Sequence, residues 1–183
     1  MAYVIIIIVL LVIIGPILAL LPSKRQKQQI QMRKAARDAG CSVALTRIDD
    51  PDPNPEAYLT NTGKPLERVM AVVAYRRLRP RPGQRHQRSE IAWALNRQRG
   101  AQVDGLAPGW QWHDTRVTDL PPTLRGYLVD AVSSLPDDVI RVEEQKFIIS
   151  VYWRERADSQ GLAKLIDFLR DCAALPVVTR ADN

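Results

Sequence analysis

Apolar side chains fill the start of the chain without interruption and then give way abruptly to polar ones. No charged residue occurs from Ala2 to Leu21, and Ile, Val and Leu dominate this run. A helix of about 20 residues is about 30 Å long, which matches the hydrocarbon core of a bilayer. The run lacks the basic n-region and the cleavage site of a signal peptide. We therefore expect residues 1–22 to form a retained, single-pass transmembrane anchor.

A basic segment follows the apolar run, and its composition predicts a second helix. Residues 23–40 consist largely of good helix formers and end at Gly40, a common helix stop. The bases expected here to touch anionic lipid or a partner are Lys24, Arg25, Lys27, Arg33 and Lys34. By the positive-inside rule, this one-sided charge places the N-terminus outside and the remaining chain in the cytoplasm. The predicted localisation is therefore a bacterial inner membrane.

The first half of residues 41–183 mixes strand patterns with irregular stretches. CSVALTRI alternates like a strand, and a second strand is predicted around Met70–Tyr75. Between them, DDPDPNPEAYLTNTGKP is rich in Pro and Asp and predicts a long loop, either a partner-contact loop or a flexible one. For SEIAWALNRQRG we favour a short helix, although Ile91, Trp93 and Leu95 also alternate like a strand.

The C-terminal third carries the clearest periodicity. Residues 120–136 place leucines on one helical face, and a last helix is predicted to begin at an Asp158 cap. Residues 138–156 predict two strands joined by a polar turn at Glu144–Gln145–Lys146. The order of helix, hairpin and helix after a mixed first half predicts one α+β domain, with helices packed on a mostly antiparallel sheet.

The net charge of +6 comes mainly from two runs, the basic segment above and a second one with no acid. Pro80, Pro82 and Gly83 interrupt the second run, so we expect an irregular loop. We expect its arginines to contact anionic lipid or an acidic partner; they are Arg76, Arg77, Arg79, Arg81, Arg85 and Arg88. No interleaved aromatics or nucleic-acid motif accompany them, so nucleic acid is not the favoured ligand.

Residues that carry chemistry are few. The only cysteines are Cys41 and Cys172, expected to be free thiols, and the only histidines are His86 and His113. Their spacing matches no zinc motif, and no glycine-rich turn links a strand to a helix. We therefore expect no catalytic residue, metal, cofactor or small-molecule substrate. The four tryptophans are expected to be packed: Trp93 and Trp153 in the core, Trp110 and Trp112 beneath a loop.

The first 48 residues resemble those of one known family. An N-out span, a Pro-Ser exit, the basic run KRQKQQIQMRKAARDAG and the short strand CSVALTRI resemble YajC, the accessory subunit of the bacterial Sec preprotein translocase. The resemblance implies one membrane helix, a basic cytoplasmic helix and a compact β-containing domain. It also implies association with other membrane subunits of the translocase, and no catalytic residues.

These observations predict a non-enzymatic accessory or scaffold subunit of a membrane complex. Its expected partners are the lipid bilayer and other membrane proteins. One alternative is the YajC-like translocase subunit, and another is a membrane-tethered nucleic-acid-binding module. The predicted domains are an anchor over 1–22, a juxtamembrane helix over 23–40 and an α+β domain over 41–183.

Overall fold

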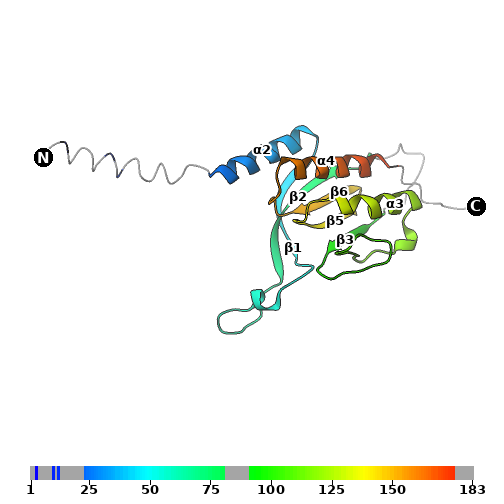
Figure 1. Ribbon diagram of the computed structural model, residues 1–183, viewed down its shortest axis with the longest axis horizontal. Coiled ribbons are helices and arrows are strands. Elements are labelled where there is room, and N and C mark those ends of the chain that lie inside the picture. Colours follow the sequence, from blue (N-terminus) through cyan, green and yellow to red (C-terminus); the bar gives the residue numbers. More distant parts are fainter. Residues whose placement is uncertain (1–2, 4–9, 11, 13–22, 81–90, 176–183) are drawn as a thin grey trace, which may run out of the picture. The chain divides into compact units, whose positions relative to one another are not determined.

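The computed structural model describes residues 3, 10, 12, 23–80 and 91–175. It divides the chain into two compact units, Met1–Lys34 and Ala35–Asn183. The larger unit holds one six-stranded sheet and the helices α3 and α4 (Figure 1). The structure therefore shows the predicted α+β class, with an antiparallel sheet.

The membrane predictions are contradicted. Across the part of the chain that the structure describes, no helix combines the length and the apolar composition needed to cross a bilayer. The one long N-terminal helix in this part, α2 (Lys24–Asp38), is built from KRQKQQIQMRKAARD, which is mostly polar and carries only a few apolar residues such as Met32 and Ala36. The run predicted as an anchor over residues 1–22 lies almost entirely outside the described residues. The absence of such a helix from the described residues is what contradicts the predicted single-pass topology and inner-membrane localisation.

Local hydrogen bonds set both ends of α2. At its start, Ser23 Oγ accepts from Gln26 N and the Gln26 side chain accepts from Ser23 N, which forms a capping box. At its end, Gly40 has a φ of 80° and donates to the Arg37 carbonyl, while Cys41 donates to the Ala36 carbonyl. This pair of bonds is a Schellman motif, which needs a left-handed residue at Gly40. The helix predicted over 23–40 is found as α2, with the bounds Lys24–Asp38.

The sheet has the strand order β1-β2-β6-β5-β3-β4, and every neighbouring pair is antiparallel. The strands are β1 (Ser42–Asp49), β2 (Val69–Leu78), β3 (Trp93–Arg97), β4 (Trp110–Trp112), β5 (Val139–Gln145) and β6 (Ile148–Trp153). β1 and β4 are therefore the two edges.

One face of the sheet packs against α4 (Ser159–Ala174), which in turn contacts α3 (Pro122–Ala131). Asp158 caps α4 by accepting from Gln160 N and Gly161 N, as predicted. The core between these layers is apolar, and its most deeply buried members include Tyr75, Leu95, Trp153, Leu124, Leu128, Leu165 and Leu169. The predicted helix within 120–136 is confirmed as α3 with a following 3-10 turn.

Two local predictions are wrong. The segment with Trp93 and Leu95 is strand β3, because its backbone pairs with β5 on one side and with the edge strand β4 on the other. The β5–β6 turn lies at Lys146 and Phe147, whose φ values of 50° and 63° suit a two-residue hairpin. Glu144, predicted in that turn, is a buried strand residue.

The tryptophan predictions fare better. Trp93, Trp110 and Trp153 are buried, and Trp112 is half-buried. The guanidinium of Arg97 lies 4.7 Å from the ring centre of Trp110, so a cation covers that indole. Packing therefore accounts for the WQW segment.

Candidate functional site

The two thiols lie in environments that suppress nucleophilic chemistry. Both cysteines are buried and free. Burial raises the pKa of Cys172 to about 12, and burial also raises the pKa of Cys41 despite the opposing effect of Arg77. A thiol with a raised pKa is protonated near neutral pH, whereas the thiolate is the nucleophile. The structure thus gives neither cysteine the activation that covalent catalysis requires.

The remaining acid–base candidates are scattered. His113 Nε2 lies 3.4 Å from Asp114 Oδ2 on a partly exposed loop. Within residues 23–80 and 91–175, no group of three or more His, Cys, Asp or Glu side chains is placed to hold a metal ion. His86 lies outside the described residues.

Arg79 and Glu144 form a buried ion pair at the junction of β2, β5 and α4. Arg79 Nε lies 2.6 Å from Glu144 Oε1, and the Trp93 indole donates to Glu144 Oε2 at 2.9 Å. The Arg79 guanidinium also donates to the carbonyl oxygens of Cys172 (2.7 Å) and Leu175 (2.9 Å), at the end of α4. These bonds satisfy carbonyls that a helix C-terminus leaves unpaired. Arg79 therefore clamps α4 to the sheet.

The second set of arginines predicted to contact lipid or a partner is described only at Arg76, Arg77 and Arg79, and these three point in different directions. Arg79 is only 4% exposed, so it has no free guanidinium for a partner. Arg77 donates to the Ala39 carbonyl at 2.8 Å, on the face that packs against α4. Arg76 follows the opposite parity along β2 and lies on the outer face of the sheet, the face turned away from α4. Arg81, Arg85 and Arg88 lie outside the described residues.

The predicted bases of the first segment all lie on α2. Lys24, Arg25, Lys27 and Lys34 are exposed, and Arg33 is half-buried and makes an interaction of its own. The contact proposed for these residues stays a prediction.

The outer face of the sheet carries polar side chains that hydrogen-bond to one another. Tyr152 donates to Glu143 Oε1 at 2.6 Å, and Arg141 Nε donates to Asn96 Oδ1 at 2.7 Å. Burial, followed by the bond to Glu143, raises the pKa of Tyr152. Beside this network, Val72, Ala74 and Ile140 form an apolar cluster with the Tyr152 ring. The polar atoms here hold neighbouring strands together.

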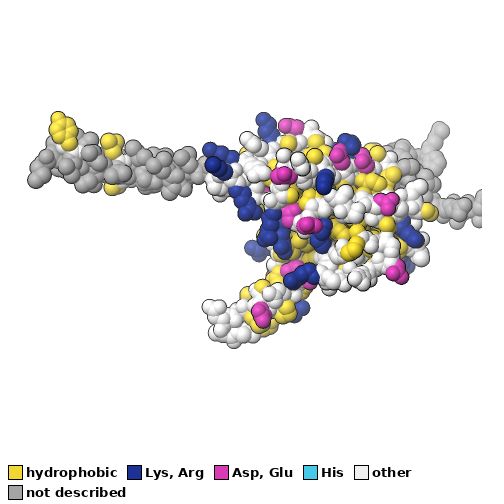
Figure 2. Space-filling view, in the orientation of Figure 1, with side chains coloured by type: hydrophobic (Ala, Val, Ile, Leu, Met, Phe, Trp, Pro, Cys, Tyr) yellow, Lys and Arg dark blue, Asp and Glu magenta, His cyan; other side chains and the backbone are white. Residues whose placement is uncertain are grey.

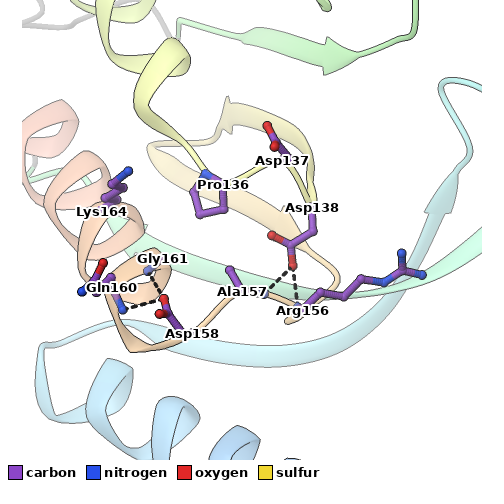
Figure 3. Close-up of a pocket in the computed structure, with 9 residues that line it drawn as sticks. All are labelled: Pro136, Asp137, Asp138, Arg156, Ala157, Asp158, Gln160, Gly161 and Lys164. Atoms are coloured by element: carbon purple, nitrogen blue, oxygen red, sulfur yellow. Dashed lines mark hydrogen bonds between the residues drawn. The ribbon is translucent and has the colours of Figure 1, made fainter.

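A pocket of about 400 Å³ lies where β5 and α4 begin (Figure 3). Its lining includes Asp137, Asp138, Asp158, Arg156 and Lys164. Two of the three carboxylates are already engaged: Asp138 accepts from Arg156 N and Ala157 N, and Asp158 caps α4. The third, Asp137, lies 3.2 Å from Arg97. Two carboxylates of this pocket therefore orient backbone, and the third pairs with a side chain of β3.

The β1–β2 arm, residues 50–68, is an ordered projection. Sequence reasoning treated it as a loop, yet it is held by its own hydrogen bonds. At its base Tyr58 donates to Asp50 Oδ2 at 2.7 Å, and Asp50 Oδ1 accepts from Asp52 N at 3.0 Å. At its tip Thr60 N donates to the Lys64 carbonyl at 2.8 Å, and Gly63 takes a φ of 76°. Asn54 caps a short 3-10 helix between them.

The same arm leaves apolar side chains in solvent. Leu59 is 47% exposed and Leu66 is 49% exposed. They lie near each other because Leu66 N donates to the Tyr58 carbonyl, and Leu59 forms a β-bridge with Pro65. Figure 1 shows the arm running beyond the sheet from the end of β1, and Figure 2 shows hydrophobic side chains on its surface. The sequence signals were the Asn54 cap and the TNTG turn, which indicate local order.

Asp52 ties the arm to the β3–β4 loop. Its carboxylate accepts from Arg99 Nε at 2.6 Å, and this hydrogen bond lowers the pKa of Asp52. The arm is thus fixed at its base and free at its tip.

Comparisons of this chain with protein-family models, with curated proteins and with solved structures found no match. The YajC resemblance accordingly stays a prediction.

Proposed function

We propose that this chain is a non-enzymatic binding protein, an accessory or scaffold subunit of a larger complex, and that the β1–β2 arm is its partner contact. The observation that carries the proposal is the combination of order and exposure in the arm. Ordering the backbone costs about 1–2 kcal/mol per residue in conformational entropy, and in an ordered loop the packing of its side chains normally offsets this cost. Here Leu59 and Leu66 contribute little burial, since about half of each stays in solvent.

A partner would supply the missing burial. Fully burying a leucine side chain contributes on the order of 1.5–3 kcal/mol, so covering the exposed half of each contributes roughly half of that, and a preformed arm binds without a further ordering cost. The Tyr58–Asp50 bond and the Thr60–Lys64 turn hold the two leucines in place before binding. The polar groups around them, such as Lys64 and Glu67, are exposed and suit the rim of an interface.

The chemistry of the domain favours a binding role over catalysis. Its buried ionisable groups, such as Arg79 and Glu144, are engaged in hydrogen bonds that join elements of the fold. The thiols are protonated near neutral pH, as their raised pKa values imply.

Site-specific photo-crosslinking of the full-length chain in the cells that make it tests the arm. A photoreactive residue replaces Leu59 in one variant and Val103 in the matched control. Val103 is also an exposed apolar residue, 37% in solvent, but lies in the β3–β4 loop. The proposal expects a discrete crosslinked partner at position 59 that Leu66→Ser abolishes, and none at 103. Equal crosslinking at the two positions, or crosslinks that survive Leu66→Ser, would contradict it.

A further inference from the structure

The two edges of the sheet differ in how they are protected. β4 has three residues, so it offers almost no backbone to an incoming strand. β1 has eight residues and pairs with β2 at every one of them, with no bulge. Natural edge strands are usually shortened, bulged or interrupted by Pro, because a long regular edge is a template for another strand. β1 carries none of these three features, and its edge protection consists of two exposed charges, Arg47 and Asp49.

The register shows which backbone groups of β1 face outward. Asp50 N donates to the Arg68 carbonyl at 2.8 Å, so residues 42, 44, 46, 48 and 50 share the hydrogen-bonded positions opposite β2. The alternate residues Val43, Leu45, Arg47 and Asp49 then direct their N–H and C=O groups to the open edge. Among the described residues, these outward groups make one hydrogen bond, a long contact of 3.5 Å from the Thr46 hydroxyl to the Arg47 carbonyl.

The side chain at the centre of this edge is also exposed to solvent. Leu45 is 75% exposed, the most exposed large hydrophobic side chain of the sheet among the described residues. Arg47 and Asp49 follow it on the same face of the strand and are exposed as well. The edge thus has an apolar centre with charged residues to one side, as interfaces between proteins commonly have.

We propose that β1 pairs antiparallel with β1 of a second copy of this chain, with Leu45 opposite the partner's Leu45. An antiparallel strand paired with itself about one residue is two-fold symmetric, so one surface serves both chains. The outward N–H and C=O groups of Leu45 meet those of the partner's Leu45. The two six-stranded sheets join into one continuous sheet. This surface is separate from the arm leucines and goes beyond the proposed function.

Charge and geometry favour a second copy over an unrelated peptide. The exposed charges of the edge, Arg47 and Asp49, sum to zero, so the two paired edges carry no net charge of their own. In this register Arg47 faces the partner's Val43, and no like charges are opposed. Because the strands are antiparallel, each arm leaves the pair at the opposite end and does not collide with the other. Strand overlap extends over Cys41 to Asp49.

A disulfide trap tests the register. Residues directly opposite in a hydrogen-bonded antiparallel pair have Cα atoms about 5.5 Å apart, which is within disulfide reach. Leu45→Cys in the full-length chain is therefore expected to form an intermolecular disulfide under mild oxidation. Thr46→Cys is the matched control. Thr46 faces the partner's Ala44, so it is not opposite the partner's Thr46. Both native cysteines are buried and do not compete.

Sedimentation of the full-length chain tests the assembly itself. Leu45→Glu opposes two carboxylates at the symmetry axis, so the two-copy species is expected to be lost while circular dichroism is unchanged, because Leu45 is exposed. Leu66→Glu, on the arm, is expected to leave the two-copy species intact. A disulfide yield for Leu45→Cys no greater than for Thr46→Cys, or two-copy species that persist in Leu45→Glu, would overturn the proposal.

Discussion

Arg79 and Glu144 are 65 residues apart in the sequence and form a buried ion pair, with 2.6 Å between Arg79 Nε and Glu144 Oε1. Arg79 brings β2 and the end of α4 to this pair, and Glu144 brings β5 and the indole of Trp93. One ionic contact thus joins four elements of the fold, β2, β3, β5 and α4.

Removing one member of this pair should be costly. Glu144→Leu leaves the Arg79 charge buried without its partner, and we expect a loss of about 3–5 kcal/mol in the free energy of unfolding. The double variant Arg79→Met with Glu144→Leu removes both charges and should recover much of that loss. Urea unfolding of the three proteins measures both effects. A single variant as stable as the double variant would show that the charges are not coupled.

Replacing a glycine by alanine should have opposite effects on stability in α4 and in α3. A Cβ on Gly161 would lie 2.7 Å from Ala157 Cβ and 3.2 Å from Pro136 Cγ, where α4 begins. We expect Gly161→Ala to destabilise by about 1–3 kcal/mol through overpacking. The control is Gly126→Ala in α3, where a Cβ would meet nothing within 4 Å. There we expect a gain of about 0.5–1 kcal/mol from helix propensity. Thermal unfolding gives both signs, and equal shifts would refute the packing argument.

The free energy of unfolding should fall as the solution becomes alkaline, partly because of Cys172. Burial raises the pKa of this thiol to about 12 in the folded chain, from an ordinary value of 9.0. Between these values the folded thiol keeps a proton that the unfolded thiol has lost, so stability is full below about pH 9 and declines above it. Cys172→Ala should reduce the slope of stability against pH between pH 9 and 10. Urea midpoints at several pH values measure the slope; an unchanged slope would contradict the assignment.

The order of the arm should depend on Tyr58. Tyr58→Phe removes the 2.7 Å hydrogen bond to Asp50 while keeping the ring. We expect amide exchange across residues 51–66 to speed up by roughly fivefold, since one net hydrogen bond contributes about 1 kcal/mol. Amides of α4 should be unaffected, because the arm is remote from that helix. Hydrogen exchange by mass spectrometry resolves the two regions, and a uniform acceleration would mean a global effect instead.

Sequence patterns predict best where the determinants are local. The last helix shows its cap at Asp158 and its apolar stripe within one segment, and α4 begins where the pattern places it. The hairpin of β5 and β6 is also found, because each strand alternates clearly. The prediction is wrong at Glu144. The polar Glu-Gln-Lys sequence suggests a turn, but Glu144 is buried in a strand because Arg79, distant in sequence, forms an ion pair with it.

The candidate sites were harder to predict. The arginine run from Arg76 to Arg79 looks uniform in sequence, but strand parity sends Arg76 and Arg77 to opposite faces and buries Arg79. The arm was predicted as an irregular loop, because its hydrogen bonds join residues such as Tyr58 and Asp50 that no periodicity relates. The exposure of Leu59 and Leu66 depends on that fold and has no sequence signature.

The three-residue length of β4 limits how far this sheet can grow. A chain with two long open edges adds strands at both ends and assembles without limit, as fibres do. Here the edge at Trp110–Trp112 is too short to template a strand, so pairing through β1 uses up the one long edge. The stoichiometry of the assembly is thereby closed at two copies, and the brevity of β4 is what separates a finite complex from a filament.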